Sequence, residues 1–122
     1  MVDSTIKILS IVLFLGFVSQ GYSQCFLSDL SVSQIQTGVK MQGKPEWNVT
    51  ITNNCSCVQK NVILSCNGFQ SVEQIDPSLL KISPNGCLVN DGQPIYTDAI
   101  KFKYVWNQSF PLNPISSEIA CS

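Results

Sequence analysis

The sequence contains no histidine and no arginine, and charged residues make up only 12% of its 122 residues. Histidine is the commonest general base near neutral pH and the commonest nitrogen ligand for metals. Nucleic-acid binding requires a basic face that displaces counterions, whereas the formal net charge of this chain is -1. We therefore expect a protein that is not an enzyme, uses no cofactor or metal and does not bind nucleic acid.

Long hydrophobic runs are also scarce. The one at residues 8–18 follows a lysine and precedes the small residues Gly21 and Ser23, a pattern typical of a secretion signal cleaved after Ser23. We expect a signal peptide at residues 1–23 and a secreted cysteine-rich β domain at residues 24–122. No other segment approaches the roughly 20 apolar residues that span a bilayer, so we expect no membrane anchor and an extracellular location.

Cysteines, in contrast, are abundant for a chain of this size. They are Cys25, Cys55, Cys57, Cys66, Cys87 and Cys121. An even set in an exported protein predicts that all are disulfide-bonded, while the pairing stays open. Cys55 and Cys57 point to the same face of an extended strand, so we expect them to bond two different partners. A zinc-thiolate site is the alternative, but structural zinc favours wider spacings and a second pair of ligands.

Alternation of apolar and polar residues predicts β-strands. Phe102, Tyr104 and Trp106 fall on one face of a strand, with two lysines between them on the other. Residues 47–52 alternate in the same way, and residues 62–66 indicate a third strand. Short strands separated by turns favour an all-β fold, namely a small disulfide-stabilised β-sandwich with at most one short helix.

Turn-forming residues separate these strands. We expect turns at residues 43–45, 53–54, 83–86 and 90–92. Residues 88–89 and Ile95 flank the last of these turns as the two strands of a hairpin would. The single helical signal is at residues 76–80, where Asp76 is a candidate N-cap and Pro77 occupies the first helical position.

Three triplets match the N-glycosylation acceptor pattern. They begin at Asn48, Asn54 and Asn107. Asn48 and Asn107 lie on or just after outward-facing strand positions, whereas a bonded Cys55 could hide Asn54. Glycans at these positions would mark solvent-exposed faces.

Aromatic and acidic residues suggest two further functions. Trp47, Tyr104 and Trp106 could form a flat platform for stacking on sugars, although aromatics on strands more often fill the core. Carbohydrate is therefore a possible partner. A glycoside hydrolase would need two opposed carboxylates, and nothing in the spacing of the acidic residues singles out such a pair.

Several segments of the chain form a recognisable set of motifs. They are Gln36-Thr37-Gly38, residues 43–49, Asn54-Cys55, residues 66–69, Asp76-Pro77, residues 87–94, residues 102–106 and Cys121-Ser122. Together these segments resemble the tapetum-determinant family of small secreted plant proteins. The stretch Cys-Leu-Val-Asn-Asp-Gly-Gln-Pro at residues 87–94 is the most specific of these. The resemblance covers essentially all of residues 24–122, although Cys55-Ser56-Cys57 is tighter than the corresponding family spacing.

This resemblance implies a secreted ligand that binds the extracellular leucine-rich repeats of a receptor kinase and directs cell fate in the developing anther. Only the cysteines carry over from the family residue by residue, as the framework on which activity depends. The resemblance, the export signal and the missing catalytic set together predict a disulfide-stabilised signalling ligand. The alternative is a cell-wall carbohydrate-binding module without catalysis.

Overall fold

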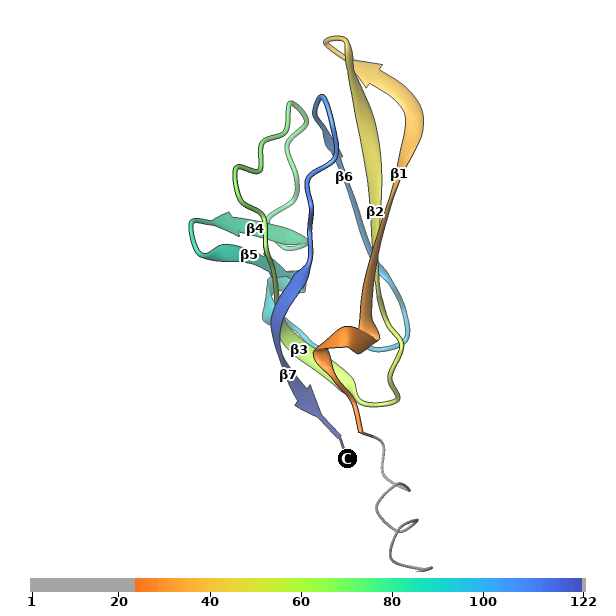
Figure 1. The fold of residues 1–122 in the computed structure, drawn as a ribbon, viewed down its shortest axis with the longest axis vertical. Coiled ribbons are helices and arrows are strands. Elements are labelled where there is room, and N and C mark those ends of the chain that lie inside the picture. Colours follow the sequence, from red (N-terminus) through yellow and green to blue (C-terminus); the bar gives the residue numbers. More distant parts are fainter. Residues whose placement is uncertain (1–23, 122) are drawn as a thin grey trace, which may run out of the picture.

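The computed structural model describes residues 24–121, which form two antiparallel β-sheets packed face to face (Figure 1). The predicted signal peptide lies outside the described residues. None of the helical turns in residues 24–121 has the length or apolar character that crossing a bilayer requires.

The two sheets contain seven strands. Sheet A has the order β1-β2-β6, with β1 at Leu30–Met41, β2 at Lys44–Asn53 and β6 at Ile100–Val105. Sheet B has the order β4-β5-β3-β7, with β3 at Val58–Leu64, β4 at Leu80–Ser83, β5 at Gly86–Val89 and β7 at Pro114–Ala120. Two single-turn 3-10 helices, η1 at Leu27–Asp29 and η2 at Asn90–Gly92, precede β1 and follow β5. The predicted fold class is confirmed.

The core lies between the sheets and follows the predicted alternation. Its buried side chains come from both layers and include Val49, Ile51, Phe102 and Tyr104 of sheet A and Val62, Leu64, Leu80, Cys87 and Val89 of sheet B. Lys101 and Lys103 of β6 point to solvent. Burying one face of each sheet supplies the main driving force for this fold.

The turn at residues 90–92 does not form the hairpin that the sequence suggested. Asn90 and Asp91 have the positive φ angles of 54° and 55° that such a hairpin turn uses. However, β5 pairs with β4, and Ile95 forms an isolated bridge with Gln59 of β3. The predicted turn at residues 83–86 forms a hairpin instead, because it joins β4 to β5 with Ser83 opposite Gly86. The helical signal at residues 76–80 forms a single hydrogen-bonded turn, in which Asp76 Oδ1 accepts from Ser78 N at 2.9 Å.

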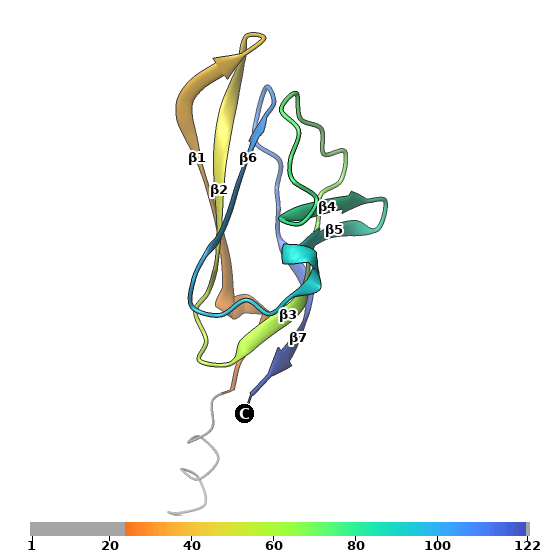
Figure 2. The same ribbon diagram turned by 180° about the vertical axis from the view of Figure 1, so that it is seen from behind.

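The connection between β3 and β4, residues 65–79, is here called the long segment, and it is hydrogen-bonded to the end of β6. Val72 N donates to Val105 O at 3.0 Å, and Val105 N donates to Ser71 Oγ at 3.0 Å. Phe69 is buried and packs edge-on against Tyr104, with ring centres 5.0 Å apart. This segment therefore runs beside sheet A, as Figure 2 shows from the opposite side.

Candidate functional site

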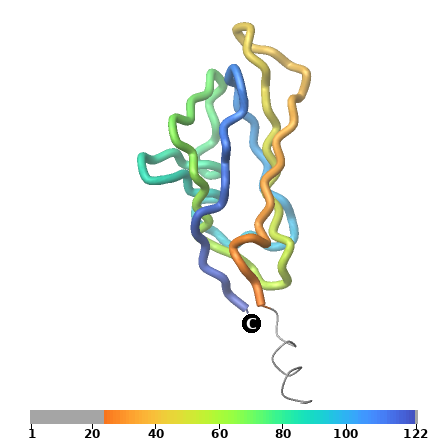
Figure 3. The backbone as a smooth tube through the Cα atoms, viewed as in Figure 1, coloured from red at the N-terminus to blue at the C-terminus, as the bar shows by residue number. Residues whose placement is uncertain are grey.

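The six cysteines form three disulfides, and two of these lie together at one end of the sandwich. Cys25 is bonded to Cys55, Cys57 to Cys121, and Cys66 to Cys87. The Sγ atoms of Cys25, Cys55 and Cys57 lie within 4.8 Å of one another. Each of these sulfurs is in a disulfide, so the cluster presents no thiolate ligand to a metal. The cluster joins the segments that begin and end the described chain, which Figure 3 places side by side.

The three glycosylation triplets all reach the surface. Asn48 lies in β2 on the outer face of sheet A, between Ile35 of β1 and Lys103 of β6 in the cross-strand register, and is half-buried. Asn54 and Asn107 are exposed in the connections that follow β2 and β6. The bonded Cys55 does not hide Asn54, which is exposed to solvent.

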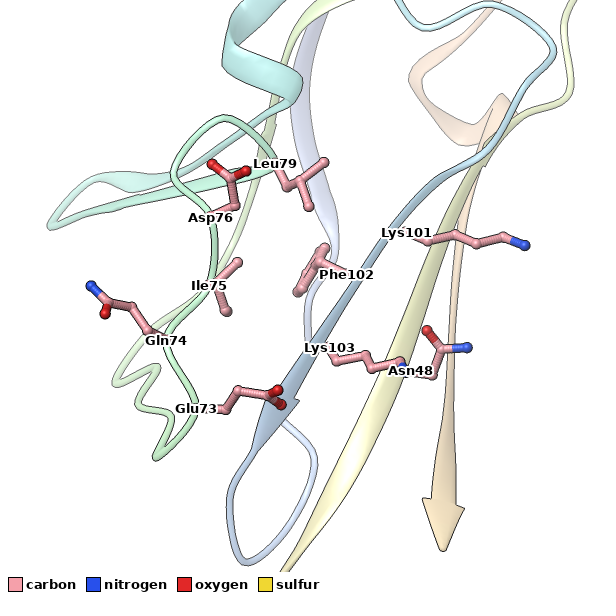
Figure 4. Close-up of a pocket in the computed structure, with 9 residues that line it drawn as sticks. All are labelled: Asn48, Glu73, Gln74, Ile75, Asp76, Leu79, Lys101, Phe102 and Lys103. Atoms are coloured by element: carbon pink, nitrogen blue, oxygen red, sulfur yellow. The ribbon is translucent and has the colours of Figure 1, made fainter. Parts of the chain in front are cut away.

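A pocket of about 420 Å³ opens between the long segment and sheet A (Figure 4). Its lining consists of Asn48, Glu73, Gln74, Ile75, Asp76, Leu79, Lys101, Phe102 and Lys103. Ile75, Leu79 and Phe102 supply apolar surface. In Figure 4, Glu73 points toward Lys103 and β6, whereas Gln74 points away. The pocket therefore has an apolar interior and a rim that carries both signs of charge.

Beside this pocket the fold brings together two carboxyl groups, Glu46 and Glu73, which the sequence spacing did not single out. Glu46 in β2 is only 6% exposed, and its Oε1 accepts a 2.7 Å hydrogen bond from Thr37 Oγ1. A hydrogen bond joins the Glu46 and Glu73 carboxyl groups. Glu73 Oε1 is buried without a hydrogen-bond partner.

The environment separates the pKa values of the two acids. The hydrogen bond from Thr37 outweighs burial and lowers the pKa of Glu46, with further help from Glu73 and Lys103. Burial, followed by the hydrogen bond and the negative charge of Glu46, raises the pKa of Glu73. The pair therefore favours the ionised form of Glu46 and the protonated form of Glu73.

This pairing differs from the arrangement in a glycoside hydrolase. The two acids of such an enzyme stand about 5 Å or more apart, so that a glycosidic bond or a water fits between them. Glu46 and Glu73 are instead hydrogen-bonded directly to each other, which leaves no room for a substrate between them. The pair can bind a proton and thereby fasten the long segment to β2.

The aromatic residues considered as a sugar platform are largely internal. Tyr104 is fully buried, donates through its hydroxyl to Gln34 Oε1 and accepts from Phe110 N at 2.9 Å. Trp47 is half-buried and stacks on Tyr104 with ring centres 6.5 Å apart. Trp106 is also half-buried. The three rings therefore do not form one exposed plane, and packing explains them.

Comparisons with known proteins extend over nearly all of the described residues. The sequence profile of the family described as Tapetum determinant 1, C-terminal, matches residues 26–122. TPD1 protein homolog 1 of Arabidopsis thaliana is 32% identical over 96 residues, which cover 75% of this chain and 54% of the homologue. TPD1 protein homolog 1B of Oryza sativa subsp. japonica is 35% identical over 82 residues, 65% of this chain and 47% of the homologue.

An uncharacterized protein of Arabidopsis thaliana is 35% identical over 92 residues, which cover 70% of this chain and 71% of that protein. This chain thus spans about half the length of the two TPD1 homologues. No solved structure matches it. The resemblance inferred from the motifs is confirmed, and the chain belongs to the tapetum determinant family.

Proposed function

We propose that this chain is an exported, non-enzymatic signalling ligand of plant reproductive development. Its partner would be the leucine-rich-repeat ectodomain of a receptor kinase, and its effect would be on cell-fate specification, as in the anther. The family match over residues 26–122 is the observation that carries the proposal. The two TPD1 homologues are about twice as long, so their activity comes to this chain only as part of the proposal.

The physical form of the domain supports this role. Three disulfides and two packed sheets make a small, preformed surface. A rigid ligand loses little conformational entropy on binding, and a repeat array offers an extended concave surface to such a ligand. The direct hydrogen bond between Glu46 and Glu73 favours a structural role for these acids, which supports a function without catalysis.

Export and glycosylation complete the proposal. We infer cleavage after Ser23, release into the apoplast and glycosylation of Asn48, Asn54 and Asn107. The disulfides support an oxidising route, and the surface positions of the three asparagines support glycan attachment. A glycan on Asn48 would stand at the rim of the pocket beside sheet A.

The test is calorimetric titration of the secreted protein against a panel of plant leucine-rich-repeat receptor ectodomains. Mass spectrometry of the same material establishes its N-terminus and glycans. We expect saturable binding to one ectodomain by the oxidised protein and none by a reduced and alkylated sample. Absence of binding across the panel, by oxidised protein that melts cooperatively, would overturn the proposal.

A further inference from the structure

The β1–β2 hairpin extends past the rest of the sandwich at the end opposite the paired disulfides (Figures 1 and 2). Its outermost part, residues 39–44, is here called the hairpin tip. Val39 is 50% exposed and Met41 is 39% exposed. Because they are two positions apart in a strand, their side chains share one face of the hairpin. The tip thus exposes apolar side chains to solvent, and these side chains add little buried area to the fold.

The tip is also positively charged. It contains Lys40 and Lys44 and no acidic residue, and the nearest acid in sequence, Glu46, is buried. Lys44 pairs with Met41 in the register, and its Nζ lies 5.6 Å from the ring centre of Trp106. Lys40, between Val39 and Met41, points to the opposite face, whereas Lys44 lies beside Met41. A tip with apolar side chains on one face and a lysine on each face is complementary to an apolar depression that is rimmed by carboxylates.

The backbone holds the tip in a defined shape. Gln42 and Gly43 have φ angles of 54° and 78°, which suit the two-residue turns that match strand twist. The bulge at its base is fixed by Thr37, whose Oγ1 accepts from Val39 N at 3.2 Å and donates to Glu46 at 2.7 Å. A preformed hairpin loses little entropy when it enters a partner.

We propose that the hairpin tip is the main receptor-contact element. It inserts Val39 and Met41 into an apolar depression on the ectodomain, while Lys40 and Lys44 face carboxylates at the rim. This inference rests on the proposed function, because it requires a protein partner. Ile35 is more exposed, at 66%, but it lies beside Asn48 in the register, where the proposed glycan would cover it.

The β4–β5 hairpin offers a matched control. Ile82 there is 52% exposed and follows the exposed Lys81, so it also combines an apolar side chain with a lysine. The β4–β5 hairpin has one exposed apolar side chain beside one lysine, whereas the hairpin tip has two apolar side chains and two lysines. If exposed apolar and basic side chains on any hairpin were enough for binding, substitutions at Ile82 and Lys81 would weaken it as well.

The experiment compares Val39→Ser/Met41→Ser and Lys40→Glu with Ile82→Ser and Lys81→Glu, each titrated against the ectodomain that binds the wild-type protein. We expect at least a tenfold loss of affinity for the double variant. We expect at least a threefold loss for Lys40→Glu that shrinks at high salt, and changes within twofold for both controls. All five substituted residues are exposed, so melting temperatures should stay close to wild type.

The outcomes separate the two proposals. If the wild-type protein binds no ectodomain, the proposed function fails and the inference falls with it. If the wild-type protein binds and the tip variants bind equally well, only the inference is overturned. A wild-type dimer that the double variant converts to monomers, seen by sedimentation, would assign the tip to a second copy of the chain and would also overturn it.

Discussion

At the scale of single residues, the Glu46–Glu73 pair makes stability depend on pH. The pKa of Glu73 is raised above 4.5 by burial and by Glu46, so the folded protein binds this proton more tightly than the unfolded chain. The resulting stability is fully present below about pH 4.5 and is lost as pH rises through the folded pKa. The lowered pKa of Glu46 acts oppositely, because its stabilisation is lost as pH falls through its own folded value.

The variant Glu73→Gln should isolate the first effect. Glutamine keeps a donor for Glu46 at every pH, so the free energy of unfolding should no longer fall between about pH 4.5 and neutrality. At pH 7 the variant should be more stable than wild type by about 1 kcal/mol, the usual size of one net hydrogen bond. Denaturant unfolding of both proteins at a series of pH values measures this.

Asp91→Asn serves as the control, since it removes the same charge from an exposed turn. Its unfolding curve should follow the pH dependence of wild type. If Glu73→Gln and Asp91→Asn gave the same pH profile, the carboxyl pair would not be the source of the effect. The sequence did not reveal this pair, because the two acids come from separate elements that meet only when the long segment folds back against β6.

At the scale of elements, Gly86 sets the close packing of the β4–β5 hairpin on β3. Its φ of 143° is one that other residues rarely adopt, and a Cβ added there would meet Ile63 Cγ2 at 2.6 Å and Leu64 O at 3.3 Å. The variant Gly86→Ala should therefore lose about 3 kcal/mol of stability from overpacking and backbone strain. Thermal and denaturant unfolding measure the loss.

Gly68→Ala separates the two causes. Gly68 also has a positive φ, 70°, but a Cβ there would meet nothing within 4 Å. This variant should cost about 1 kcal/mol, from the backbone alone. Equal losses in the two variants would show that contact with Ile63 contributes nothing and that the packing explanation is wrong.

The strands that could be predicted from sequence are those whose burial alternates. Residues 47–52 and 101–106 were identified because every second side chain enters the core. β1, β4 and β7 lie at sheet edges and are mostly exposed, so their sequences carry little apolar alternation. Turn chemistry located residues 90–92 but could not show which strands they connect, because the pairing of Ile95 with Gln59 depends on the whole sheet.

At the scale of the whole molecule, the disulfide between Cys57 and Cys121 should contribute the most to stability. It closes a loop with a sequence separation of 64, compared with 30 and 21 for the other two. The chain-entropy relation gives about 4.3 kcal/mol for the longest loop and about 3.6 for the loop of Cys25 and Cys55. It also secures β7, most of whose side chains are exposed.

Cys57→Ala/Cys121→Ala should accordingly lose about 4 kcal/mol. Hydrogen exchange should show that the amides of β7 lose protection before those of β2 and β6. Cys25→Ala/Cys55→Ala is the comparison, with a smaller loss and protected β7 amides. This ranking would be contradicted if Cys57→Ala/Cys121→Ala had a free energy of unfolding within 1 kcal/mol of wild type and kept its β7 amides protected.

The adjacent disulfides also determine how the domain would carry mechanical force. If the protein is pulled at residues 25 and 121, tension passes from Cys25 to Cys55, through Ser56 to Cys57, and across to Cys121. This covalent path bypasses almost the entire sandwich. Without the two disulfides, residues 25–121 could extend to roughly 330 Å, at about 3.4 Å per residue. A domain held at this end would therefore keep its opposite end undeformed under tension.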